Sequence, residues 1–240
     1  MKLSLARRVA AEFVGTAFLV AAVVGSGIMG ERLSNGNVAL ALLCNTIATG
    51  AALVALILAF GPVSRAHFNP AVTLSDAMEG GIRWAEVPAY VSGQVVGGIA
   101  GAVAANFMFG SPLVSFSHHV RSGTAQVASE FIATFGLLCV IWGCSGVRST
   151  VAFAVGAYIT SAYWFTSSTS FANPAVTLAR CLSDTFAGIR PKDVLPFVLA
   201  QLLGAVAATL LSRLIVPSLE LGAEAVVARH PEPTDLRLPR

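Results

Sequence analysis

The hexapeptide Asn-Pro-Ala-Val-Thr-Leu occurs twice in this chain of 240 residues, at Asn69–Leu74 and again at Asn173–Leu178. Asparagine is among the best residues for capping a helix N-terminus, and proline is favoured at the first helical position because its missing N–H would have no partner there. Each copy therefore predicts the start of a helix. A helix from Asn69 to Met78 would be roughly 15 Å long, which is half of a hydrocarbon core of about 30 Å.

The composition indicates that these two short helices lie in a membrane. Apolar residues make up 55% of the chain and charged residues 11%, against about 25% charged residues in a typical soluble domain. A spanning helix needs roughly 20 apolar residues. Six segments approach or exceed that length, at residues 9–28, 38–60, 87–109, 127–142, 150–165 and 194–216. The stretches at 69–78 and 173–183 are amphipathic and too short to span.

The two halves of the chain repeat each other. "AEFVGT" at 11–16 corresponds to "SEFIAT" at 129–134, and the segments that begin at Gln94 and Gln201 both read Gln-x-x-Gly. Because three spans per half is an odd number, the second half must enter the membrane from the opposite side. Such inverted repeats use interrupted helices to build a site at the membrane midplane. The predicted fold class is an all-α membrane protein with six transmembrane helices and two re-entrant half-helices.

The repeats define the predicted domain organisation. A channel domain covers residues 1–216, with inverted repeats at about 8–110 and 126–216, and a tail at 217–240 contains four prolines and mixed charge. Such a composition is typical of disorder. The basic residues favour cytoplasmic termini, hence a multi-pass protein of the cell (inner) membrane with a cytoplasmic tail. The cytoplasmic set is then Lys2, Arg7, Arg8, Arg65, Arg83, Arg148, Arg213, Arg229, Arg237 and Arg240, and the outside set is Arg32, Arg121, Arg180, Arg190 and Lys192.

The meeting point of the two half-helices has a definite chemistry. Each helix N-terminus has roughly half a positive elementary charge, so cations and hopping protons are repelled where both ends meet. A capping asparagine uses its side-chain oxygen on its own helix and keeps amide N–H groups for a passing oxygen. Two ordinary asparagine-capped helices are the plainer interpretation. Two identical copies between apolar spans favour a pore for neutral hydroxylated solutes instead.

At this point the sequence resembles the major intrinsic protein family, the aquaporins and aquaglyceroporins. The resemblance covers roughly residues 8–216 and rests on "AEFVGT", "GPVSRAHFNPAVTL", "SEF", the second "NPAVTL" and the two glutamine-glycine segments. It implies a pore in every protomer of a homotetramer. It also implies that Glu12 and Glu130 accept N–H groups from the re-entrant loops. The central constriction would be formed by Asn69, Pro70, Ala71, Asn173, Pro174 and Ala175.

The resemblance also implies a second constriction, with contributors at Thr49, Ser161, Ser170 and Val176. Most members of the family have an arginine at the position of Val176. Water-selective members have a histidine near the position of Ser161 and a phenylalanine near that of Thr49, whereas glycerol-type members have an aromatic residue near Thr49 and an aspartate at Thr177. None of these is present here. We therefore expect a wide constriction without an aromatic side chain.

A valine with small partners resembles the aquaglyceroporins of bacterial arsenic-resistance operons. The predicted function is a passive channel for glycerol-like polyols, metalloid hydroxides such as arsenite, and water, with His67 as a candidate residue of the vestibule. An ordinary water-selective aquaporin is the alternative. A secondary transporter with broken helices would need ion-coupling carboxylates at the midplane, and the spans contain only Glu12 and Glu130.

Other functional classes find little support. No HExxH, GxSxG or paired catalytic carboxylates occur, so we expect no enzyme and no cofactor. The four cysteines lack metal-ligand spacing and no metal site is predicted. A net charge of +3 from scattered residues argues against nucleic acid as a partner. The expected partners are the lipid bilayer, small neutral solutes and further copies of the chain.

Overall fold

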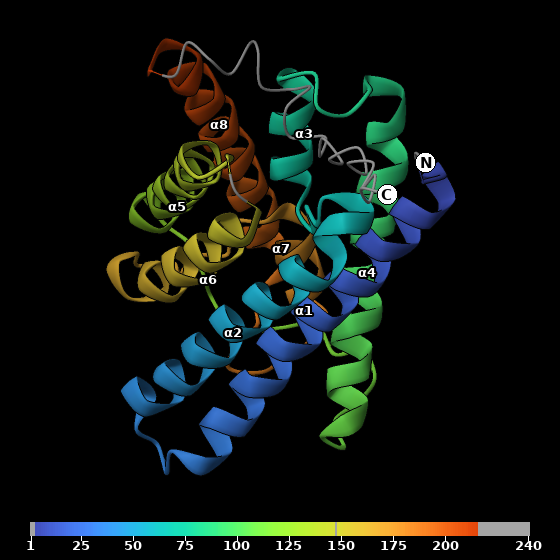
Figure 1. The fold of residues 1–240 in the computed structure, drawn as a ribbon. Helices are drawn as coiled ribbons and strands as arrows, with labels where there is room; N and C mark the ends of the chain where they lie inside the picture. The colour runs from blue at the N-terminus through green and yellow to red at the C-terminus, as the bar shows by residue number, and fades with distance from the viewer. Residues whose placement is uncertain (1–2, 147, 216–240) are drawn as a thin grey trace, which may run out of the picture.

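The computed structural model describes residues 3–146 and 148–215, and within these ranges the fold is entirely helical (Figure 1). Two helices are short, α3 (Pro70–Met78) and α7 (Pro174–Arg180), and a 3-10 turn, η1 (Trp84–Glu86), precedes α4. The long helices are α1 (Leu5–Leu33), α2 (Val38–Ser64), α4 (Val87–Met108), α5 (Thr124–Gly143), α6 (Arg148–Phe165) and α8 (Pro191–Ile215).

The six long helices coincide with the six predicted spans. Five of them are long and apolar enough to cross a membrane by length and composition. The remaining one, α6, has 18 residues and is interrupted by Ser, Thr and Tyr. Helix α1 begins before the predicted span because the Ser4 hydroxyl accepts a hydrogen bond from the backbone N–H of Arg7. The predicted fold class is confirmed.

The two repeats are interlocked through their half-helices. Helix α1 packs against α2 and α4, and α5 packs against α6 and α8. Helix α7 lies in the middle of the bundle, where it contacts α4 as well as α8 (Figure 1). Helix α3 likewise contacts α8 and α4. Each half-helix is therefore supported by the last helix of both repeats.

Small residues allow the long helices to approach closely. A Cβ atom at Gly97 or Gly101 of α4 would collide with the backbone carbonyls of Phe13 and Ala17 on α1. This contact is the helix pairing expected of a Gly-xxx-Gly stripe. Gly204 of α8 meets the backbone of α5 in the same way.

The second half-helix ends earlier than its amphipathic pattern predicts, at Arg180 rather than at Ser183. Its carboxyl end is held by another segment, because the carbonyl of Leu182 accepts hydrogen bonds from the backbone N–H of Ser115 and from the Asn106 amide. The helix therefore ends at Arg180, with Cys181 as its C-cap residue. The domain boundaries stay a prediction, and the tail at 217–240 lies outside the described residues.

Candidate pore

The two repeated asparagines are joined across the middle of the bundle. The Asn69 side-chain oxygen accepts from the backbone N–H of Ala71 at 2.9 Å, and its amide donates to the carbonyl of Ala172 at 2.8 Å. Asn173 accepts from Ala175 at 3.0 Å and donates to the carbonyl of Phe68 at 2.8 Å. Each cap thus also fixes the loop before the other half-helix. Since an amide has two N–H groups, one donor per asparagine remains for a solute.

A buried carboxylate holds the loop that precedes each half-helix. Glu12 accepts hydrogen bonds from the backbone N–H groups of His67 and Phe68, at 3.0 and 2.6 Å, and from the Ser64 hydroxyl at 2.6 Å. The Gln94 amide also donates to it, at 2.8 Å. With every lone-pair direction used on the protein, this carboxylate has a positioning role.

The second repeat contains the same arrangement. Glu130 accepts from the backbone N–H groups of Phe171 and Ala172, both at 2.9 Å, and from the Gln201 amide at 2.6 Å. That amide also donates to the Thr177 hydroxyl. Both carboxylates therefore have the N–H groups of the re-entrant loops as their main partners.

The loops themselves have an unusual backbone. Left-handed φ angles occur at Arg65 (75°), Ala66 (54°) and Phe68 (49°) in the first loop. The corresponding residues of the second loop, Thr169, Ser170 and Ala172, have φ angles of 62°, 48° and 48°. Non-glycine residues adopt this region at a cost, and they do so where the surroundings enforce it. The carboxylates described above are those surroundings.

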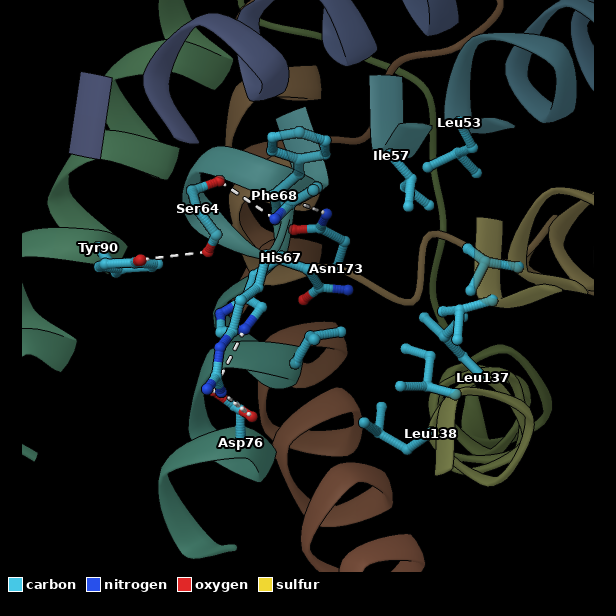
Figure 2. Close-up of a pocket in the computed structure, with 18 of the residues that line it drawn as sticks. Leu53, Ile57, Ser64, His67, Phe68, Asp76, Tyr90, Leu137, Leu138 and Asn173 are labelled. Atoms are coloured by element: carbon cyan, nitrogen blue, oxygen red, sulfur yellow. Dashed lines mark hydrogen bonds and ion pairs between the residues drawn. The ribbon is translucent and has the colours of Figure 1, made fainter. Parts of the chain in front are cut away.

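A continuous cavity of about 1360 Å³ runs along both half-helices. One wall is polar and includes His67, Asn69 and Asn173. The opposite wall is aliphatic, and Figure 2 shows Leu137 and Leu138 across the cavity from Asn173. Further aliphatic lining residues include Leu19, Val23, Leu53, Ile57, Ile141, Val151, Val155 and Ile159. A path with one polar and one apolar wall suits a solute that has hydroxyl groups on a carbon or metalloid centre.

One end of the cavity contains a charged cluster, which we call the α3 vestibule (Arg65, His67 and Asp76). Arg65 forms an ion pair with Asp76 at 2.8 Å, and the imidazole Nε2 of His67 lies 3.4 Å from the same carboxylate. The other ring nitrogen of His67 is 3.1 Å from the Thr73 hydroxyl. His67, the candidate residue of the vestibule, lines the cavity (Figure 2).

Comparisons with known proteins agree with this architecture. The family model "Major intrinsic protein" matches residues 1–152 and 143–236. The chain belongs to the major intrinsic protein family. Its members are membrane channels and not enzymes.

Individual relatives extend this result. The chain is 55% identical over 210 residues to the aquaglyceroporin AqpS of Rhizobium meliloti (strain 1021), covering 87% of this chain and 90% of that protein. It is 34% identical to the aquaporin NIP1-3 of Oryza sativa subsp. japonica, covering 72% of this chain and 62% of that protein. The X-ray structure of the aquaglyceroporin from Plasmodium falciparum shares the fold, with a TM-score of 0.71, 20% identity and coverage of 91% of this chain and 100% of that one.

Three of the four positions inferred for the second constriction of this family lie on the cavity. They are Thr49, Ser170 and Val176. Ser161 does not line the cavity, because its side chain is exposed and its hydroxyl donates to the carbonyl of Tyr158 on its own helix. The cavity-facing residues of α6 are Val151, Val155, Ile159 and Tyr163, which are spaced by about one helical turn. Ser161 lies half a turn away from that face, so its assignment is wrong.

Two aromatic side chains also line this part of the cavity, contrary to the expectation that none would. The Tyr163 hydroxyl lies 3.2 Å from that of Thr49, and Phe171 stands beside Ser170. Ser161 was predicted from a fixed distance before Asn173. That distance holds only if the loop after α6 has the usual length of the family. The 155, 159, 163 periodicity was the signal that could have identified Tyr163.

A further charged residue was not predicted to face the cavity. Arg180, the last residue of α7, lines it together with Val176 and Phe171. Its position one helical turn after Val176 was the available signal. We call Arg180, Phe171 and the neighbouring Arg121 the α7 vestibule. Arg121 lies in the segment before α5, and burial lowers the pKa of its guanidinium to about 10.

Proposed function

We propose that this member of the family is an aquaglyceroporin, a passive channel for glycerol-like polyols, metalloid hydroxides such as arsenite, and water. The observation that carries the proposal is the two-walled cavity, with one free amide N–H of each asparagine on its polar wall and Val176 where most of the family has an arginine. The relative named aquaglyceroporin AqpS, at 55% identity, supports the same class of solute.

The two walls explain the preference for neutral hydroxylated molecules. A polyol or a metalloid hydroxide leaves water only where its oxygens find donors, and the asparagine amides and two half-helix N-termini supply them. The remaining, less polar surface of the solute loses little free energy when it leaves water and contacts Leu137 or Ile159. An ion lacks the ligands that would replace its hydration shell, and a cation is also repelled by the helix N-termini.

The carboxylates argue against ion-coupled transport. Glu12 and Glu130 are fully buried, and their oxygens are occupied by loop N–H groups and glutamine amides. Binding a coupling ion at either one would leave several buried donors unpaired, at a cost of about 1–3 kcal/mol for each group. A passive pore needs no such step.

The membrane setting is part of the proposal. Large apolar side chains such as Phe18, Ile47, Phe153 and Leu214 are exposed on the bundle, which suits contact with lipid or with other copies of the chain. We infer a homotetramer in the cell inner membrane with both termini cytoplasmic. The α3 vestibule then faces the cytoplasm and the α7 vestibule faces outward.

Purified protein in liposomes tests the proposal by stopped-flow light scattering. We expect glycerol, arsenite and water to cross faster than in empty liposomes, with solute rates that rise linearly with concentration and do not depend on an ion gradient. Leu199→Ala, a change at an exposed apolar position of α8, serves as a control with unchanged rates. Saturating entry, or entry that stops when an ion gradient is collapsed, would overturn the channel assignment.

A further inference from the structure

Arg180 combines burial with access to the cavity. The residue is only 2% exposed, yet it lines the cavity beyond Val176. Its Nε donates to the carbonyl of Ala187, and its guanidinium carbon lies 3.4 Å from the centre of the Phe171 ring. Stacking on an aromatic face and a carbonyl hydrogen bond fix the orientation of the guanidinium plane.

The terminal nitrogens of Arg180 form no hydrogen bond to the part of the chain that the structure describes. Neither has a hydrogen-bond partner within residues 3–146 and 148–215, and neither is among the buried polar atoms of these ranges that lack one. They are therefore open to the cavity. The hydroxyl of Ser170, on the same loop as Phe171, is buried and has no hydrogen-bond partner among the described residues. The free donors at this place in the cavity wall are therefore the terminal nitrogens of Arg180.

The charge of Arg180 is also uncompensated. No carboxylate lies within ion-pair distance of it in the part of the chain that the structure describes. The second guanidinium of the α7 vestibule, that of Arg121, lies 5.0 Å from the same phenyl ring, and its donors are directed at the carbonyls of Gly188, Ser168 and Phe186. This end of the cavity has two positive charges close to a single ring.

We propose that Arg180 determines selectivity in this chain, donating hydrogen bonds to solute hydroxyl groups and repelling cations from a position one helical turn beyond Val176. The displacement along α7, four residues, is about 6 Å. It leaves an aliphatic side chain at Val176 and places the charge nearer the mouth. The inference rests on the proposed channel function and adds the residue that discriminates between solutes.

The first experiment compares Arg180→Gln, Arg180→Lys and Arg32→Gln in liposomes. Arg32 follows Glu31, which lies beside Asp184 and Phe186 of the loop after α7. Arg32 is exposed and does not line the cavity, and its replacement removes the same charge. Dissipation of an imposed pH gradient should rise roughly tenfold or more in Arg180→Gln, because the variant removes a unit positive charge that lies on the cavity lining and repels a passing cation. Arg32→Gln should match the unchanged protein.

The lysine variant separates charge from hydrogen bonding. Lysine keeps the positive charge but lacks the planar group that stacks on Phe171. Proton exclusion should therefore persist in Arg180→Lys. The preference for glycerol over 1,2-propanediol, which lacks one hydroxyl, should fall about threefold because fewer oriented donors remain.

Moving the charge is the most direct test. The double variant Val176→Arg with Arg180→Gln returns the arginine to the usual position of the family, and it should recover most of the lost proton exclusion. Size-exclusion profiles and thermal melting show whether each variant is folded, and the lysine variant keeps the test valid if glutamine at position 180 is not tolerated.

The outcomes are distinct. Unchanged proton leak together with unchanged glycerol preference in folded Arg180 variants would overturn the role of Arg180 and leave the channel intact. A parent protein that conducts no neutral solute would instead overturn the proposed function.

Discussion

Each end of the cavity is built around one copy of the same hexapeptide, yet the charged side chains at the two ends differ. Relative to their asparagines, His67 and Phe171 occupy the same position, and so do Asp76 and Arg180. At the α3 vestibule a carboxylate pairs with Arg65 and approaches an imidazole. At the α7 vestibule a guanidinium stacks on a phenyl ring with no carboxylate partner among the described residues.

The parts that the two ends share are the parts that hold the backbone. The glutamate, the glutamine, the left-handed loop residues and the asparagine cross-link all occur in both halves. The parts that differ face the solute. The comparison teaches that the repeat fixes a symmetric backbone, while single side chains one or two turns along each half-helix set the electrostatics of each mouth.

The largest effect should come from breaking the shared support. Glu130→Ala leaves the backbone N–H groups of Phe171 and Ala172 buried without an acceptor, at a cost of about 3–5 kcal/mol of folding free energy. Glu12→Ala should cost at least as much, because Glu12 accepts from the same kinds of groups and also from the Ser64 hydroxyl. Thermal melting and the recovery of folded oligomer measure both losses. A large loss in one half with none in the other would contradict the symmetry.

The second prediction places the same residue in both halves. Val176→Arg should cut glycerol and arsenite flux about tenfold while water flux persists, because Arg180 one turn away repels the new charge into the cavity. Val72→Arg should have a smaller effect, since its charge can pair with Asp76 one turn along. Stopped-flow rates compare the two variants. Equal solute flux in Val176→Arg and the parent would mean that Val176 does not face the narrowest part.

The third prediction concerns a variant in which both vestibules are positively charged. Asp76→Asn removes the acceptor of Arg65 and leaves both vestibules positive, and we expect a loss of about 1–2 kcal/mol of folding free energy. Glycerol flux should stay within about twofold, because the asparagine donors and the apolar wall are unchanged. Thermal melting and flux on the same preparation check this. A collapse of glycerol flux in a folded variant would give Asp76 a direct role in conduction.

The smallest effect concerns the loop after α7. The backbone N–H and imidazole of His118 donate to Asp184, and these hydrogen bonds hold the pKa of that carboxyl below its usual range. Its stabilising contribution is therefore present above the unfolded-state pKa and is lost as pH falls through the lowered value. The pair is largely exposed, so Asp184→Asn should cost only a few tenths of a kcal/mol at pH 7 and nothing near pH 2. Melting curves at the two pH values test the sign.

The sequence by itself determined that the chain lies in lipid, that its halves repeat, and which residues lie at the centre of the pore. Apolar runs fixed six long helices because lipid offers no partner for backbone N–H and C=O groups. The two hexapeptides fixed the half-helices because asparagine capping and proline at the first helical position are local effects. The buried glutamates could be assigned from the family resemblance, since a carboxylate inside a span needs a partner.

Only the tertiary structure decided which side chains reach the solute. The orientation of α6 depends on its packing against α2 and α5 and on the loop that follows it, so counting from Asn173 gave Ser161 where Tyr163 lines the cavity. The place of Arg180 depends on Phe171 and Ala187, which come from the loops on either side of α7. Side-chain direction at the end of a short helix is set by contacts outside that helix, and a motif records only the backbone that makes those contacts possible.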